Sequence, residues 1–146
     1  SEGALSTNLT NLIIGFMMSL SGADNTTPEA VPSVITNTNT AAASPWTKAT
    51  SIDTTGFDGC MIVAVMASDI DNGANNVVHT FATTSGTTGA WTVRGEFTND
   101  GFYSIAVATA PQTTGGAITV TGTGTRPALS AGRCLLLMAI KIHGIL

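Results

Sequence analysis

Three apolar runs dominate the chain, and the segments between them alternate polar and apolar residues. The runs cover Leu12–Leu20, Cys60–Ser68 and Cys134–Ile142, and the middle run contains no charged residue. A strand that is apolar on both sides is typical of a sheet covered on both faces. We therefore expect the three runs to lie together in the interior of one sandwich.

Between these runs, short segments show the period of two residues that a half-buried strand requires. Turn signals rich in Gly, Asn, Asp and Pro separate them. Together with the apolar runs they make about nine strands, and no amphipathic helix is apparent. We predict an all-β fold, a single antiparallel β-sandwich or jelly roll over residues 12–146, with a short N-terminal arm over residues 1–11. The alternating segments are residues 33–40, 46–52, 77–84, 91–97, 102–110 and 117–123.

The alternation also predicts which side chains face the core. Trp46 and Ile52 share one face of their strand, and His79 shares one face of residues 77–84 with Val77 and Phe81. In residues 91–97, the expected inward residues are Trp91, Val93 and Phe97. The expected outward residues are Thr92, Arg94 and Glu96. Residues 117–123 place a ladder of threonine hydroxyls outward: Thr119, Thr121 and Thr123.

Few charges are available to keep such a chain soluble as a monomer. Only 10% of the residues are charged while 43% are hydrophobic, against a typical charged fraction of about 25%. This balance predicts that other subunits cover much of the surface, so we expect a homo-oligomer. The net charge is −4 and the five basic residues are scattered, which argues against binding to nucleic acid. The apolar run Leu12–Leu20 is shorter than the roughly 20 residues that cross a bilayer, so no membrane contact is expected.

No catalytic constellation stands out, and the prediction is a protein that is not an enzyme. His79 and His143 have no acid or nucleophile at motif spacing, and the chain has no Gly-x-Ser-x-Gly motif. We expect both histidines to be structural. Cys60 and Cys134 each open an apolar run, and they are expected to be buried thiols, with a disulfide as the open alternative.

Two further clusters offer ligand chemistry, each with a structural alternative. The oxygen-rich loop Asp69–Asn75 could hold Ca²⁺, but it departs from the EF-hand pattern, and Asx-rich turns also arise from backbone geometry. The prediction is therefore no metal and no cofactor. Trp46, Trp91 and Tyr103 could stack on a sugar, but their same-face neighbours are apolar, which favours a place in the core.

From Gly59 onward the order of segments resembles a β-sandwich domain of phage and prophage virion proteins. The matching features are an apolar strand after a Gly turn, a Thr-rich loop that ends in Trp-Thr, two alternating strands and a last apolar strand. They fall at Gly59–Ser68, Thr84–Thr92, Tyr103–Ala108, Ala117–Thr121 and Leu135–Gly144. The family pattern has an acidic residue in the last strand, where this chain has Lys141. The resemblance implies a particle-bound structural role and carries over no catalytic residue.

These observations predict a virion structural protein, most specifically a capsid decoration (cement) protein that is assembled in the host cytoplasm. It would form a trimer or dimer and contact the major capsid protein or other virion subunits. The alternative is a glycan-binding or receptor-binding module of a tail or surface fibre, and a jelly-roll hydrolase is a third possibility that lacks a recognisable site. The residues expected to bind the partner lie in the arm: Ser1, Glu2, Gly3, Ala4, Leu5 and Leu9.

Overall fold

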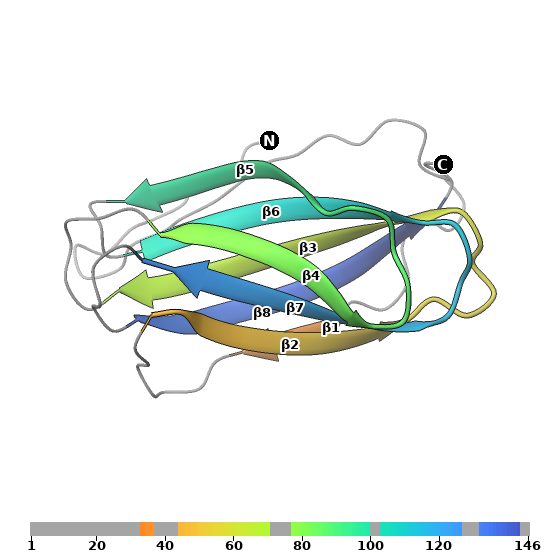
Figure 1. Ribbon diagram of the computed structural model, residues 1–146, viewed down its shortest axis with the longest axis horizontal. Helices are drawn as coiled ribbons and strands as arrows, with labels where there is room; N and C mark the ends of the chain where they lie inside the picture. The colour runs from red at the N-terminus through yellow and green to blue at the C-terminus, as the bar shows by residue number, and fades with distance from the viewer. Residues whose placement is uncertain (1–32, 37–43, 71–76, 100–102, 127–131, 144–146) are drawn as a thin grey trace, which may run out of the picture.

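The chain forms two antiparallel β-sheets that pack face to face, as the computed structural model in Figure 1 shows. The structure describes residues 33–36, 44–70, 77–99, 103–126 and 132–143. None of these residues belongs to a helix. The described residues therefore contain no helix that is long and apolar enough to cross a membrane. The strands are β1 (Ser33–Thr36), β2 (Trp46–Asp53), β3 (Cys60–Ile70), β4 (Val78–Ser85), β5 (Thr92–Asn99), β6 (Tyr103–Gln112), β7 (Ala117–Thr125) and β8 (Gly132–His143).

Five strands form one sheet in the order β1-β8-β3-β6-β5, and three form the other in the order β2-β7-β4. The predicted apolar strands β3 and β8 are neighbours at the centre of the larger sheet, where Val65 pairs with Met138. On its other side β3 pairs with β6 through ten residues. The all-β class and the central position of two of the apolar runs are therefore confirmed.

The core lies between the two sheets. From the five-stranded sheet, β3 contributes Ile62 and Met66, and β8 contributes Leu137; each of these side chains is completely buried. From the three-stranded sheet come Ile118 and Val120, the inward residues that the alternation predicted. The sequence pattern thus placed the core side of β7 correctly.

Two glycines of β7 let the sheets approach closely. A Cβ atom at Gly122 would lie 2.7 Å from the Met66 sulfur, and one at Gly124 would lie 2.5 Å from the Trp46 indole nitrogen. Real Cβ atoms do not come this close to heavy atoms, so a larger residue would force the neighbours apart. The absence of side chains at these positions makes room for the core residues of both sheets.

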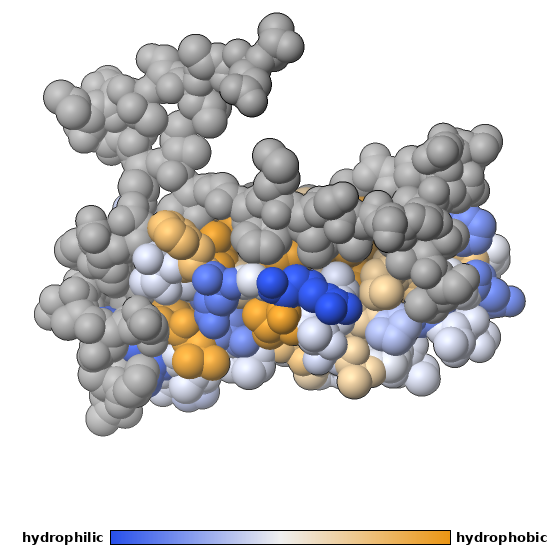
Figure 2. Space-filling view, turned by 90° about the horizontal axis from the view of Figure 1, so that it is seen from above, coloured by the Kyte–Doolittle hydropathy of each residue, from blue (hydrophilic) through white to orange (hydrophobic). Residues whose placement is uncertain are grey.

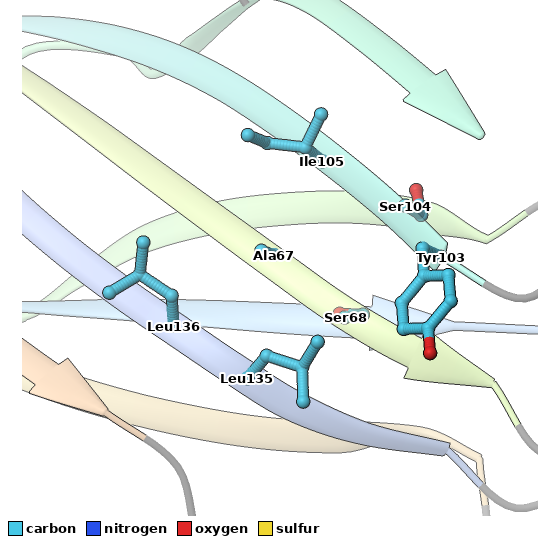
Figure 3. Close-up of a pocket in the computed structure, with 7 residues that line it drawn as sticks. All are labelled: Ala67, Ser68, Tyr103, Ser104, Ile105, Leu135 and Leu136. Carbon is cyan, nitrogen blue, oxygen red and sulfur yellow. The ribbon is translucent and has the colours of Figure 1, made fainter. Parts of the chain in front are cut away.

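The outer faces of the two sheets differ in character. The outer face of the three-stranded sheet carries the predicted hydroxyl ladder, in which Thr47 and Thr123 lie 3.2 Å apart and Thr84 and Thr121 lie 2.8 Å apart between hydroxyl oxygens. The outer face of the five-stranded sheet is mostly apolar, because the alternate residues of its central strands are chiefly Met, Val, Ala, Leu and Ile. Thr109 and the Asp69–Arg133 ion pair are the polar residues of these strands on the same face. A cavity of about 240 Å³ opens on this apolar face beside Ile105 and Leu136 (Figure 3).

The prediction for β5 was wrong in part, and a bulge is the reason. The pairing of β5 with β6 shifts by one residue between Val93 and Gly95, and an extra residue turns all later side chains to the opposite face. Glu96 therefore faces inward, and Phe97, which is 52% exposed, faces outward. Val93 precedes the shift and pairs with the core residue Ala108, yet it is 44% exposed at the edge of the sheet. Figure 2 views the molecule from the side of β5, where hydrophobic (orange) and hydrophilic (blue) residues mix.

Several predictions fall outside the described residues. The described part of the chain contains eight strands, and the ninth predicted strand, Leu12–Leu20, lies outside that part. The same holds for the arm over residues 1–11 and for the boundary between arm and sandwich. Residues 37–40, the predicted continuation of β1, are also outside it.

Candidate functional site

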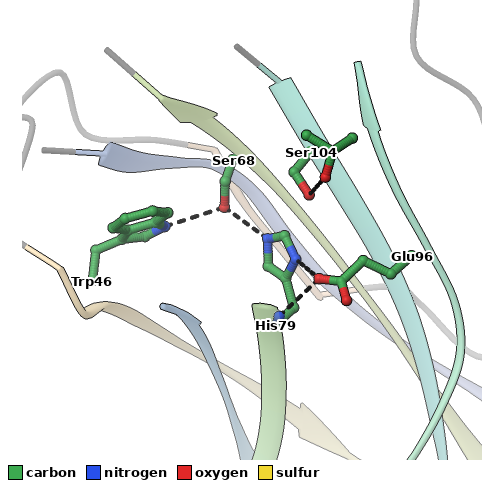
Figure 4. A network of polar contacts seen from close by, with 6 residues as sticks. Trp46, Ser68, His79, Glu96 and Ser104 are labelled. Atoms are coloured by element: carbon green, nitrogen blue, oxygen red, sulfur yellow. Dashed lines mark hydrogen bonds and ion pairs between the residues drawn. The ribbon is translucent and has the colours of Figure 1, made fainter. Parts of the chain in front are cut away.

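A series of hydrogen-bonded side chains runs through the core and crosses between the two sheets three times (Figure 4). The indole N–H of Trp46 on β2 donates to the Ser68 hydroxyl on β3, with 3.1 Å between the heavy atoms. Ser68 Oγ lies 3.0 Å from His79 Nε2 on β4, and His79 Nδ1 lies 2.6 Å from Glu96 Oε1 on β5. We call these four residues the inter-sheet network.

Three members of the network follow the alternation along their strands, and a bulge places the fourth. Trp46 and His79 occupy inward positions of alternating strands, Ser68 lies on the inner side of β3, and the β5 bulge turns Glu96 inward. A buried histidine needs partners for both ring nitrogens. The inward position of His79 was therefore a usable signal for a polar network, and Gly95 within a strand was a signal for the bulge.

The hydrogen bonds define one arrangement of protons. The Glu96 carboxylate accepts from the backbone N–H of His79 at 2.8 Å, and its short contact with Nδ1 requires a proton on that nitrogen. Nε2 is then an acceptor, so the Ser68 hydroxyl donates to it while accepting from Trp46. Every donor in the series from Trp46 to Glu96 meets an acceptor, with a neutral imidazole in the middle.

Burial controls the electrostatics of the histidine. Desolvation lowers the pKa of His79 below its ordinary value, and the hydrogen bond and negative charge of Glu96 oppose this effect in part. The side chain of His79 is fully buried, whereas that of Glu96 is 29% exposed. The Glu96 carboxylate therefore contacts water, whereas the His79 ring does not.

The order serine, histidine, carboxylate matches that of a hydrolytic triad, but the setting differs. Ser68 is completely buried and its oxygen already receives the indole N–H of Trp46. A triad needs a nucleophile that a substrate carbonyl can approach, with donors for the oxyanion beside it. The cavity near Ser68 opens on the outer face of the sheet, and the Ser68 hydroxyl points to the inner face. In this conformation the network connects the sheets and is closed to substrate.

A second polar cluster lies at the opposite end of the core, around Lys141. Its ammonium lies 3.4 Å from the centre of the Phe57 ring and donates to the backbone carbonyl of Asp53 at 3.3 Å. Lys141 is 4% exposed, so the ring and the carbonyl take over part of the solvation that water would give. Lys141 therefore has a structural role inside the core.

The other predicted histidine and the two cysteines are also structural. His143 packs edge-on against the Phe57 ring. Cys60 and Cys134 are free and buried, and they lie at opposite ends of β3 because Cys134 pairs with Ser68, eight residues beyond Cys60. About 26 Å separates positions eight residues apart along a strand, so a disulfide between the two is excluded in this fold.

The aromatic platform, the alternative to a place in the core, is not formed by the described residues. Trp46 is 4% exposed and Trp91 is partly buried, stacked on Phe81 and bonded through its indole N–H to the Thr83 hydroxyl at 3.0 Å. Tyr103 lies at the far end of β6 and lines the apolar cavity with Ile105. The core prediction is confirmed for Trp46, and the three rings share no exposed face.

The remaining candidate residues are only partly described. Asp69, the first residue of the oxygen-rich loop, accepts from Arg133 Nε at 2.7 Å and so has a cationic partner. Residues 71–76 of that loop lie outside the described residues. Among the residues that are described, no three His, Cys, Asp or Glu side chains form a group that could hold a metal ion. The predicted partner-binding residues of the arm also lie outside: Ser1, Glu2, Gly3, Ala4, Leu5 and Leu9.

Comparison with known proteins found no match: no protein-family model, curated protein or solved structure is similar to the chain.

Proposed function

We propose that this protein is a non-enzymatic structural subunit of a virus particle, a decoration protein that binds a phage capsid as a symmetric dimer or trimer. The observation that carries the proposal is the outer face of the three-stranded sheet. Its side chains are mostly small, many of them carry a hydroxyl group, and almost none is charged. Asp53 at one end of β2 is the only charged residue among its outward side chains on the described strands. The capsid role itself comes from the resemblance to virion domains.

Such a face loses little when another protein covers it. A buried polar group costs free energy unless it is hydrogen-bonded, and a buried charge costs more. Here the hydroxyls already bond to one another across the strands, as Ser51 does to Thr119 at 3.0 Å between oxygens. The low charge of the whole chain, 10% of residues, has the same effect on any permanent interface.

The histidine network also favours a structural role over an enzymatic one. Its serine and imidazole are buried between the sheets, and their hydrogen bonds join strands of both sheets. The glycan-binding alternative has less support, because Trp46, its strongest candidate, contributes its ring to the core.

Oligomeric state provides the first test. Sedimentation equilibrium of the full chain should give a dimer or trimer, and Thr121→Glu, at the centre of the hydroxyl face, should shift it toward monomer. Thr87→Glu adds the same charge on the exposed loop between β4 and β5 and serves as the matched control. A chain that remains monomeric at millimolar concentration would contradict the proposal.

Binding to a particle provides the second test. Capsids of the tailed phage that encodes the chain, stripped of the protein, should bind it again and release their DNA at a higher temperature. Removal of residues 1–11 and the Thr121→Glu substitution should each lower occupancy, while Thr87→Glu should not. Unchanged occupancy and unchanged rupture temperature with both changes would refute the proposed contact surfaces.

A further inference from the structure

The outer face of the five-stranded sheet forms a second apolar layer. Residues that pair across β8, β3 and β6 share a face, and on this face the outward residues of β3 from Met61 to Ala67 are all apolar. Val63 and Val107 are 6% and 3% exposed, although no described strand lies across them. The apolar side chains of this face are Met61, Val63, Val65, Ala67, Ile105, Val107, Leu136, Met138, Ile140 and Ile142.

A solvated sheet face would be polar, as the outer face of the other sheet is. Antiparallel sheets with one exposed face show a clean alternation of apolar and polar residues, and β7 follows this rule while β3 does not. A contiguous apolar face of this size on a soluble protein marks a surface that another segment or molecule covers.

We propose that the apolar segment Leu12–Leu20 of the same chain lies across this face and covers it. The segment contains no charged residue, and its composition of Leu, Ile, Phe, Met, Gly and Ser matches an apolar surface. Nine residues in extended form span about 30 Å, and the eleven residues of β3 span about 36 Å. One such segment is long enough to follow the central strand.

The connection to β1 permits this arrangement. Twelve residues, 21–32, separate the segment from β1, and extended they reach about 40 Å. β1 pairs with β8, and β3 is the next strand, so the centre of the face is about 10 Å away across the sheet and a covering layer lies about 10 Å above it. A segment tethered so closely has an effective concentration in the millimolar range or above, which favours it over a second copy.

The cavity on this face gives the segment an anchoring position. It holds about 240 Å³ and is lined by side chains that include Tyr103, Ile105, Leu135 and Leu136, which project from the same side of the sheet (Figure 3). Leu135 is the extra residue of the bulge in β8 opposite Ala67 and Ser68. A large apolar side chain of the segment, such as Phe16, fits such a cavity by size and chemistry.

Thiol labelling tests the proposal. A Met138→Cys variant of the full chain places a reporter at the centre of the face, and it should react with maleimide at least tenfold more slowly than Thr87→Cys on the exposed loop between β4 and β5. Adding Ile13→Asp and Ile14→Asp, which charge both sides of an extended segment, should abolish most of this protection. Thr26→Asp with Thr27→Asp in the connection is the control and should leave it intact. The wild-type chain, in which both native cysteines are buried, gives the background rate of maleimide labelling.

Equal labelling of the two reporters, or protection that survives Ile13→Asp with Ile14→Asp, would overturn the proposal. In case the charged variant does not fold, a benzophenone amino acid at position 138 of the otherwise unchanged chain provides a second measurement. Its photoproducts should map to residues 12–20, and in a mixture of isotope-labelled and unlabelled chains they should join residues of one chain. Products between chains, or protection that depends on protein concentration, would assign the cover to a second copy instead. The outcome is separable from the oligomer test above, because neither reporter lies on the hydroxyl face of the three-stranded sheet.

Discussion

His79 Nδ1 lies 2.6 Å from Glu96 Oε1, and the two residues belong to different sheets. The same carboxylate oxygen accepts the backbone N–H of His79 at 2.8 Å. Glu96 therefore holds both the ring and the main chain of β4, and Ser68 holds the other side of the ring. The edges of the two sheets are joined at this point by hydrogen bonds rather than by apolar packing alone.

Loss of the histidine should destabilise the fold strongly. His79→Ala removes a buried ring and leaves Ser68 and Glu96 without their partner, and we expect a loss of about 2–4 kcal/mol in the free energy of unfolding. Urea denaturation followed by tryptophan fluorescence measures this loss. Thr80→Ala, at the exposed neighbouring position of β4, should change it by less than about 0.5 kcal/mol. Equal effects of the two substitutions would contradict a structural role for the network.

Stability should also fall in mild acid because of His79. Burial lowers the pKa of His79, so below about pH 6.5, the ordinary pKa of histidine, the unfolded chain binds a proton that the folded chain does not. The free energy of unfolding then decreases as the pH falls, by up to about 1.4 kcal/mol for each pH unit, until the lowered pKa is reached.

The non-titrating variant His79→Gln isolates this contribution. Its free energy of unfolding should vary less between pH 7.5 and 5.5 than that of the wild type, measured by urea denaturation at each pH. Parallel pH profiles for the two proteins would show that His79 has the same proton affinity in the folded and unfolded chains, against this prediction.

The two thiols should be unreactive in the folded protein. Burial raises the pKa of Cys134 to about 11 and raises that of Cys60, whose increase is reduced by the positive charge of Lys141. The thiolate is the reactive form, so a thiol-exchange reagent at pH 8 should detect no thiol in the native protein and two after unfolding in urea. Detection of one or more thiols before unfolding, or of none afterwards, would be the opposite result.

Alanine at the two close-approach glycines of β7 should have unequal effects. At Gly122 the new methyl group would contact the flexible side chains of Met66 and Leu137, which can move. At Gly124 it would contact the rigid indole of Trp46, which is held by its bond to Ser68. We expect losses of about 1 kcal/mol for Gly122→Ala and about 3 kcal/mol for Gly124→Ala. Thermal unfolding measures both, and a larger effect at Gly122 would contradict the role assigned to the indole.

The alternation of residue types was sufficient to predict much of the fold. Two-residue periodicity placed the inward residues of β2 and β7 and grouped those of β4 on one face, because consecutive side chains of a strand must point to opposite faces. Uninterrupted apolar runs placed β3 and β8 at the centre of a sheet, because such strands need cover on both sides. Composition indicated a low-charge surface. The periodicity and the apolar runs depend only on neighbouring residues, and composition needs no structure. The sequence by itself therefore determined these properties.

Only the tertiary structure decided which strands meet and which polar groups find each other. The β5 bulge depends on the register against β6, and it turned Glu96 toward His79 against the simple alternation. Ser68, His79 and Glu96 come from three strands of two sheets, and no spacing along the chain encodes their distances. The separation of Cys60 from Cys134 is likewise a matter of register. Pairing between distant strands is set by the sum of many weak contacts across the whole core, which a local pattern does not contain.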